Sequence, residues 1–240
     1  MRFSKSTYSQ NMKKSYSKYI CDLIKSVEIA KPIYSSDISK KIAEHFTIPI
    51  DKASAATATT LKRILDSKLI DDLRFYQKGI YYRTKITPFG EIPIDKDNLI
   101  IDKYLKNDNG YETDLSLLHK WGFTTQIPNN RIIATNNIIR NTRKNKALNI
   151  TLRSPKITIN KDNKRYLQVL DILNILDKAP IDIRDPHKKI AGIITMFNLS
   201  YKELLYFASE YYNDNVIKQL TKVIKAEREI EWFYIKILNL

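Results

Sequence analysis

The chain has 240 residues, with 41 Lys and Arg against 26 Asp and Glu, so its net charge is +15 at pH 7, and 43% of its residues are hydrophobic. This composition excludes disorder along the whole length, because the chain can bury the core of one large or two modest domains. The lone Cys21 excludes an internal disulfide, and no apolar run approaches the roughly 20 residues that cross a bilayer. We therefore expect a cytoplasmic protein without a membrane partner.

The positive charge is concentrated in two blocks. Residues 1–90 hold 17 basic and 8 acidic side chains, and residues 131–165 hold 10 basic and 1 acidic side chain. Two interpretations stay open: a surface that binds a polyanion such as nucleic acid, or a Lys-rich surface without a specific partner.

The first third of the chain predicts three short helices. Residues 1–15 lack periodicity and are expected to form a tail. Apolar residues at steps of three and four predict a helix over 17–29 and a second helix that starts at 35–37 and ends before Pro49. A third helix is predicted over 52–67, and its inward face is formed by Ser54, Thr57, Ala58, Leu61, Ile64 and Leu65.

A hairpin is predicted after the third helix. Residues 69–75 and 79–85 are rich in aromatic and β-branched residues, and the turn between them ends in Gly79. Three helices followed by a hairpin predict a winged helix-turn-helix over 16–90; the alternative is a generic small α+β lobe. The Pro- and Gly-containing stretch 86–98 predicts a domain boundary.

The second half, 98–240, predicts a mixed α/β domain that ends in several helices, which makes the whole chain α+β. Strands are predicted over 131–135 and 147–159. The predicted helices cover 97–106, 114–121, 166–176, 188–197, 201–211, 216–224 and 227–238.

Residues on the outer face of the third helix and in the hairpin turn are the candidate contacts to duplex DNA. Small residues allow a helix to enter the major groove closely, Thr and Ala methyls can contact thymine, and Arg or Lys can reach guanine or phosphate. The alternative is that the small residues only serve helix packing. The candidates are Ser36, Lys52, Ala56, Thr59, Thr60, Lys62 and Arg63, with Arg74, Tyr76, Gln77 and Lys78 placed against backbone phosphates.

The second basic block gives a further candidate patch in the C-terminal domain. It either extends the DNA footprint or contacts RNA or an acidic partner, or it is a solvated face. Its members are Arg140, Arg143, Lys144, Lys146, Arg153, Lys156, Lys164 and Arg165.

Neither a catalytic site nor a bound cofactor is predicted. His45, His119 and His187 are far apart in sequence and lack second ligands at metal spacing. The carboxylate clusters fall in a hairpin, in a connector and at alternating helix positions, so they do not predict the convergent set that metal-dependent nucleotidyl transfer needs. We expect a non-enzymatic protein without a metal.

Several segments in the same order resemble the AbiEi-type antitoxins of bacterial abortive-infection toxin–antitoxin systems. The segments are Leu61-Lys62-Arg63-Ile64-Leu65, Gly79-Ile80-Tyr81-Tyr82-Arg83, Thr87-Pro88-Phe89-Gly90 and Gly122-Phe123-Thr124-Thr125-Gln126-Ile127-Pro128. The resemblance spans roughly residues 35–225, and the Gly-Phe-Thr-Thr-Gln-Ile-Pro segment is its most specific element.

This resemblance implies a transcriptional autorepressor that binds an inverted-repeat operator, with two copies on DNA. It also implies an antitoxin that counters a separately encoded nucleotidyltransferase-type toxin, with or without a direct complex. The alternative from another class is a non-catalytic binding module or stand-alone regulator on a mobile element, directed at RNA or a foreign effector protein.

Overall fold

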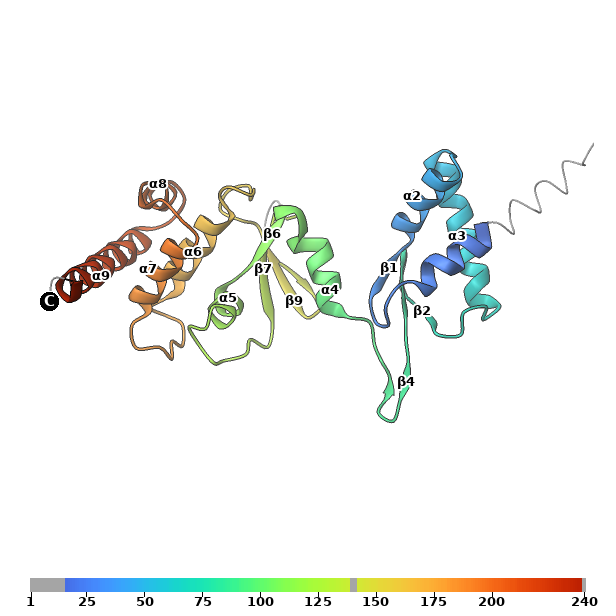
Figure 1. Cartoon of the computed structure of the whole chain (residues 1–240), viewed down its shortest axis with the longest axis horizontal. Coiled ribbons are helices and arrows are strands. Elements are labelled where there is room, and N and C mark those ends of the chain that lie inside the picture. The colour runs from blue at the N-terminus through green and yellow to red at the C-terminus, as the bar shows by residue number, and fades with distance from the viewer. Residues whose placement is uncertain (1–15, 139–141, 239–240) are drawn as a thin grey trace, which may run out of the picture. The chain divides into compact units, whose positions relative to one another are not determined.

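The computed structural model describes residues 16–138 and 142–238, with residues 229–238 as backbone only. The chain is a mixed α+β protein that divides into two compact units, Met1–Leu99 and Ile100–Leu240 (Figure 1). The α+β class expected from the sequence is therefore confirmed. The expected tail over 1–15 lies outside the described residues. No helix in the described ranges is long and apolar enough to cross a membrane.

Unit 1 packs helices against one face of a small sheet. Residues 16–25 are helical and are followed by β1 (Pro32–Tyr34), α2 (Ser35–His45) and α3 (Ile50–Asp66). Next come β2 (Leu73–Gln77) and β3 (Ile80–Arg83), and the sheet order is β1-β3-β2 with antiparallel pairs. Fully buried Ile20, Ile24, Ile42, Leu61 and Ile64 form the centre of the core.

The hairpin predicted after the third helix is present, but its first strand starts later than expected. Residues 67–72 form turns and bends, and β2 begins at Leu73. The first helix is also shorter than predicted, because residues 26–30 form turns and Ala30 adopts a positive φ of 69°. β1 was not predicted, since three residues are too few to display a period.

The connector between the predicted domains contains a second, two-residue hairpin. β4 (Ile86–Thr87) and β5 (Gly90–Glu91) pair antiparallel and extend away from the helices of unit 1 (Figure 1). Thr87 Oγ1 donates to the carbonyl of Gly90 (2.8 Å) and accepts from the N–H of Phe89 (3.2 Å). Local hydrogen bonds thus hold a turn whose Phe89 side chain is fully exposed.

Unit 2 contains a four-stranded mixed sheet. Its strands are β6 (Gly110–Thr113), β7 (Arg131–Thr135), β8 (Arg143–Asn145) and β9 (Ile150–Arg153), in the order β6-β7-β9-β8. The β7–β9 pair is parallel, and the β6–β7 and β8–β9 pairs are antiparallel. β6 and β8 were not predicted, and the predicted strand over 147–159 is limited to β9.

The two faces of this sheet bury alternating residues. Ile133 packs with Tyr104 and Leu152 on one face, and its neighbour Ala134 packs with Tyr111 and Leu167 on the other, as the period of two requires. Gly110 begins β6 where a Cβ would run into the carbonyl oxygens of Tyr104 and Ala134. The helical connection into this sheet is α4 (Lys96–Ile100), η1 (Ile101–Leu105) and η2 (Lys106–Asp108), in place of one regular helix over 97–106.

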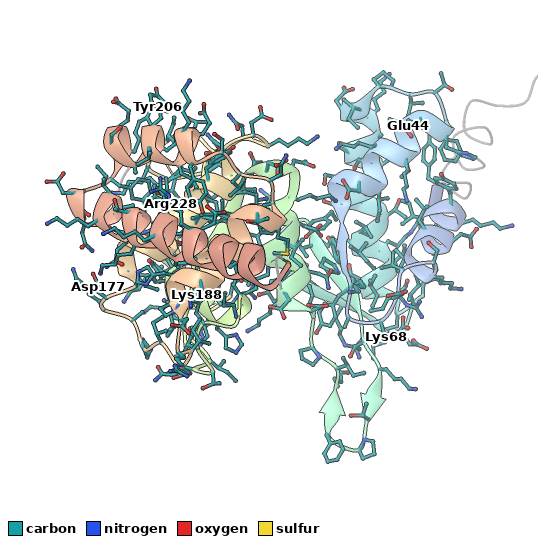
Figure 2. All side chains as sticks on the ribbon, turned by 60° about the vertical axis from the view of Figure 1, so that its left-hand side comes forward. Glu44, Lys68, Asp177, Lys188, Tyr206 and Arg228 are labelled. Atoms are coloured by element: carbon teal, nitrogen blue, oxygen red, sulfur yellow. The ribbon has the colours of Figure 1, made fainter. Side chains whose placement is uncertain are left out.

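Helices complete the described part of unit 2. They are α5 (Asp114–Lys120), α6 (Lys164–Ile175), α7 (Pro186–Met196), α8 (Tyr201–Tyr211) and α9 (Asp214–Leu238). The last two predicted helices are one continuous helix, α9, because no Gly or Pro interrupts residues 214–238. Charged side chains lie on the outside of these helices, for example Lys188 on α7 and Arg228 on α9 (Figure 2).

Candidate nucleic-acid interface

The outward face of α3 carries most of the residues predicted to meet DNA. Lys52, Thr59, Lys62 and Arg63 are exposed, and Ala56 is half-buried. None of the three cations forms an ion pair with a residue in the described part of the chain. This face can therefore offer its positive charge to an external anion.

One predicted contact on α3 is wrong. Thr60 is only 7% exposed and packs inward, with Ala53, Thr57, Leu61 and Ile64. The buried sector of the helix is rotated toward Thr60 relative to the sector centred on Leu61 that the sequence suggested. As a result, Ser54 and Ala58, which were expected in the core, are exposed and widen the small-residue part of the outer face.

The start of α2 and the β2–β3 turn lie side by side. The backbone N–H of Ser35 donates to the carbonyl of Gly79 (2.9 Å). Ser36 and Lys78 are both exposed beside this contact. Gly79 has a φ of 79°, a conformation that costs glycine little, so it permits the tight connection after Lys78. The predicted contacts Ser36 and Lys78 thus lie near each other.

The other candidate DNA contacts in the hairpin differ in exposure and in hydrogen bonding. Tyr76 is half-buried, and Gln77 is exposed at the end of β2. Arg74 forms a forked ion pair with Glu91 of β5, with Nη2–Oε1 at 2.5 Å and Nε–Oε2 at 3.2 Å. This hydrogen bonding raises the pKa of Arg74 and lowers the pKa of Glu91. Because its guanidinium already holds the β4–β5 hairpin against β2, Arg74 is not a free phosphate contact.

The second basic patch of the sequence is divided in the structure. Three of its members have their charge engaged within the unit: Arg153 pairs with Asp171 (2.5 Å), Lys164 pairs with Asp108 (3.0 Å), and Arg165 lies 4.3 Å from the ring centroid of Phe197. Lys156 lies 5.7 Å from the ring centroid of Tyr212. Arg140 lies outside the described residues.

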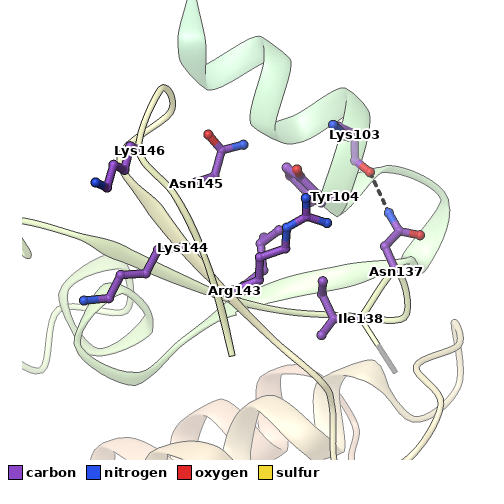
Figure 3. A pocket seen from close by; sticks show the side chains of 9 residues that line it. Lys103, Tyr104, Asn137, Ile138, Arg143, Lys144, Asn145 and Lys146 are labelled. Carbon is purple, nitrogen blue, oxygen red and sulfur yellow. Dashed lines mark hydrogen bonds between the residues drawn. The ribbon is translucent and has the colours of Figure 1, made fainter. Parts of the chain in front are cut away.

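The remaining three members lie in or just after the edge strand β8. Arg143 and Lys144 of β8 and Lys146 after it line a pocket, which Lys103 of η1 joins from the other side (Figure 3). Sequence reasoning missed Lys103, because it lies in a stretch with more acidic than basic residues. No local sequence pattern marks this pocket, because its residues come from η1 and from the edge strand β8, which are about 40 positions apart in the chain.

A buried polar cluster in unit 2 was also not foreseen. Asp171 of α6 is 2% exposed and accepts hydrogen bonds from Tyr111 (3.0 Å), Thr113 (2.6 Å), Tyr212 (2.8 Å) and Arg153 (2.5 Å). Burial, reinforced by the nearby Asp171 charge, raises the pKa of both tyrosines far above its usual range. The cluster satisfies a buried carboxylate completely and ties α6 and the residues before α9 to the sheet.

No protein-family model matches the chain, and no curated protein matches it. Among the described residues, no group of three or more His, Cys, Asp or Glu side chains is placed to hold a metal ion. The proposed function therefore rests on the exposed basic residues of α3 and on the basic pocket beside β8.

Proposed function

We propose that unit 1 is a winged helix-turn-helix domain that binds duplex DNA, with α3 in the major groove and the β2–β3 turn against the backbone. The order helix–β1–α2–α3–β2–β3 and the three-stranded sheet agree with this architecture. The observation that carries the proposal is the exposed face of α3, where Lys52, Lys62 and Arg63 have no carboxylate partner among the described residues.

Each exposed residue of α3 has its own role in the proposed contact with DNA. Thr59 donates its hydroxyl hydrogen to the Ala55 carbonyl (2.9 Å), so its oxygen remains an acceptor and its methyl group can meet a thymine methyl. Arg63, one turn later, supplies a fork of donors for guanine or phosphate. Ser36 at the start of α2 and Lys78 at the turn add backbone contacts that fix the register without reading sequence.

The resemblance to AbiEi-type antitoxins extends this proposal to the role of the whole chain. It acts as an autorepressor at an inverted-repeat operator, with two copies on the DNA, and as the antitoxin of a nucleotidyltransferase-type toxin. A test of the antitoxin role is co-expression with the neighbouring gene product: growth restored by the full chain supports it, and unrelieved toxicity contradicts it.

The DNA-binding proposal is tested with the full chain and the DNA upstream of its own gene. We expect saturable binding to the inverted repeat, at least tenfold tighter than to a scrambled duplex at the same salt concentration. Arg63→Ala should weaken operator binding by about 5- to 150-fold, since a base-contacting Arg is worth about 1–3 kcal/mol. Lys222→Ala, an exposed lysine of α9, removes the same charge from unit 2 and serves as the control. Equal affinity for scrambled DNA, or an unchanged affinity of Arg63→Ala, contradicts the proposal.

A further inference from the structure

The basic pocket of unit 2 has a volume of about 470 Å³ and a strongly one-sided charge. Lys103, Arg143, Lys144 and Lys146 line it, and none of the described residues that line it carries a carboxylate. The volume lies within the ~300–1,000 Å³ that small-molecule sites occupy.

The four cations have no carboxylate partner in the described ranges, although Lys103 Nζ lies 5.4 Å from the ring centroid of Tyr104. None of them forms an ion pair with a residue in the described ranges, whereas neighbouring Arg153 and Lys164 both do. Like charges held around one pocket repel each other, and a bound anion removes that repulsion. The chemistry of the lining therefore selects a multiply charged anion.

The backbone that carries these cations is held in place. Asn137 Nδ2 donates to the Lys103 carbonyl (3.1 Å), as the dashed line in Figure 3 marks. Arg143 and Lys144 belong to β8, which pairs with β9, and the Asn145 side chain accepts from the N–H of Leu148 (3.2 Å) and so orders the turn that contains Lys146. The pocket is thus built from positions fixed by hydrogen bonds.

The arrangement of donors fits phosphate better than a single carboxylate. In Figure 3 the Arg143 guanidinium points toward Tyr104, and the side chains of Lys144 and Lys146 extend away from it. Arg presents a planar fork that binds two phosphate oxygens, and Lys ammonium groups add point charges around it. A phosphate group has enough acceptor oxygens and charge to engage several of these side chains together.

We infer that this pocket binds the phosphate groups of a nucleotide, either a free nucleotide or the 5′-phosphorylated end of a nucleic-acid strand. Arg143 binds the phosphates from β8, Lys103 adds positive charge from η1, and Lys144 and Lys146 add positive charge at the rim of the pocket. The site lies wholly in unit 2 and does not depend on DNA binding by unit 1.

The inference is tested by titrating the full chain with ATP, pyrophosphate and short single strands that carry a 5′-phosphate or a 5′-hydroxyl, at physiological ionic strength. We expect saturable binding that falls at least tenfold in Arg143→Ala/Lys144→Ala. Lys178→Ala/Lys202→Ala removes two exposed lysines outside the pocket and should bind like the parent chain.

The probes separate the two sources of phosphate. Binding of ATP or pyrophosphate supports a free nucleotide, and binding of the 5′-phosphorylated strand but not the 5′-hydroxyl strand supports a strand end. Arg143→Gln alone, on an exposed edge strand, provides a milder variant if the double substitution lowers the yield of folded protein. Absence of saturable binding by all probes, or equal losses in the pocket and control variants, overturns the inference.

Discussion

Nη2 of Arg153 lies 2.5 Å from Oδ2 of Asp171, so a residue that the sequence placed on a basic surface is instead half of an ion pair in the core of unit 2. The Asp171 side chain is 1% exposed, and the Arg153 side chain is 27% exposed. Pairing removes Arg153 from any surface that binds nucleic acid and gives it a role in stability.

We expect Asp171→Ala to lower the free energy of unfolding by about 3–5 kcal/mol, because it removes the closest carboxylate partner of a largely buried guanidinium and the acceptor of the buried Tyr111 hydroxyl. Arg153 then keeps Thr113 (2.9 Å) and the longer contact to Asp114 (3.7 Å). Urea unfolding followed by circular dichroism measures the change. Asp162→Ala, which removes an exposed carboxylate just before α6, is the control and should cost less. A loss of under 1 kcal/mol for Asp171→Ala would contradict the role assigned to the cluster.

The stability of unit 2 should fall at high pH. Tyr111 and Tyr212 have folded-state pKa values raised far above the usual value of about 10, so their contribution is fully present below pH ~10 and is lost as the pH rises further. The phenolate absorbance of the native chain should lack these two tyrosines until unfolding exposes them. Tyr111→Phe should make unfolding less dependent on pH above 10, and full titration of all tyrosines in the native state would argue against this.

Two glycines should respond oppositely to alanine. Gly79→Ala places a side chain at φ 79° and within 3.2 Å of Ser35 Oγ, so we expect a loss of about 1–2 kcal/mol. Gly192 lies in α7 with open space around its Cα, and Gly192→Ala should stabilise by about 0.5–1 kcal/mol. Thermal unfolding of both variants checks the signs, and a stabilised Gly79→Ala would show that the turn is not constrained as described.

Lys78 and Arg74 should differ in DNA binding although both lie in the same hairpin. Lys78→Ala should weaken binding to operator and scrambled DNA alike and reduce the slope of log affinity against log salt by about 1. Arg74→Ala should leave that slope unchanged, since its guanidinium is held by Glu91. Fluorescence anisotropy at several salt concentrations measures both, and equal slopes for the two variants would contradict the assignment.

Periodic segments were predictable from the sequence, and tertiary pairings were not. The bounds of α8 at 201–211 follow from its apolar spacing, and the exposure of Lys52, Thr59 and Arg63 follows from the period of α3. β1 and β8 are three residues long, which is too short to display a period, and β1 pairs with a strand that is distant in sequence. The acidic partners of Arg74 and Arg153 lie 17 and 18 positions away in the sequence. Counting charges along the chain therefore does not show that these two arginines form ion pairs.

The close backbone packing at Gly110 can help to identify homologues of the C-terminal unit. Because the carbonyl oxygens of Tyr104 and Ala134 occupy the space of a Cβ, every other amino acid is closed off at this point of the fold. Homologues of this unit should therefore keep glycine at this position even where their surface charges differ completely. This one residue can then guide the alignment of sequences whose overall identity is low.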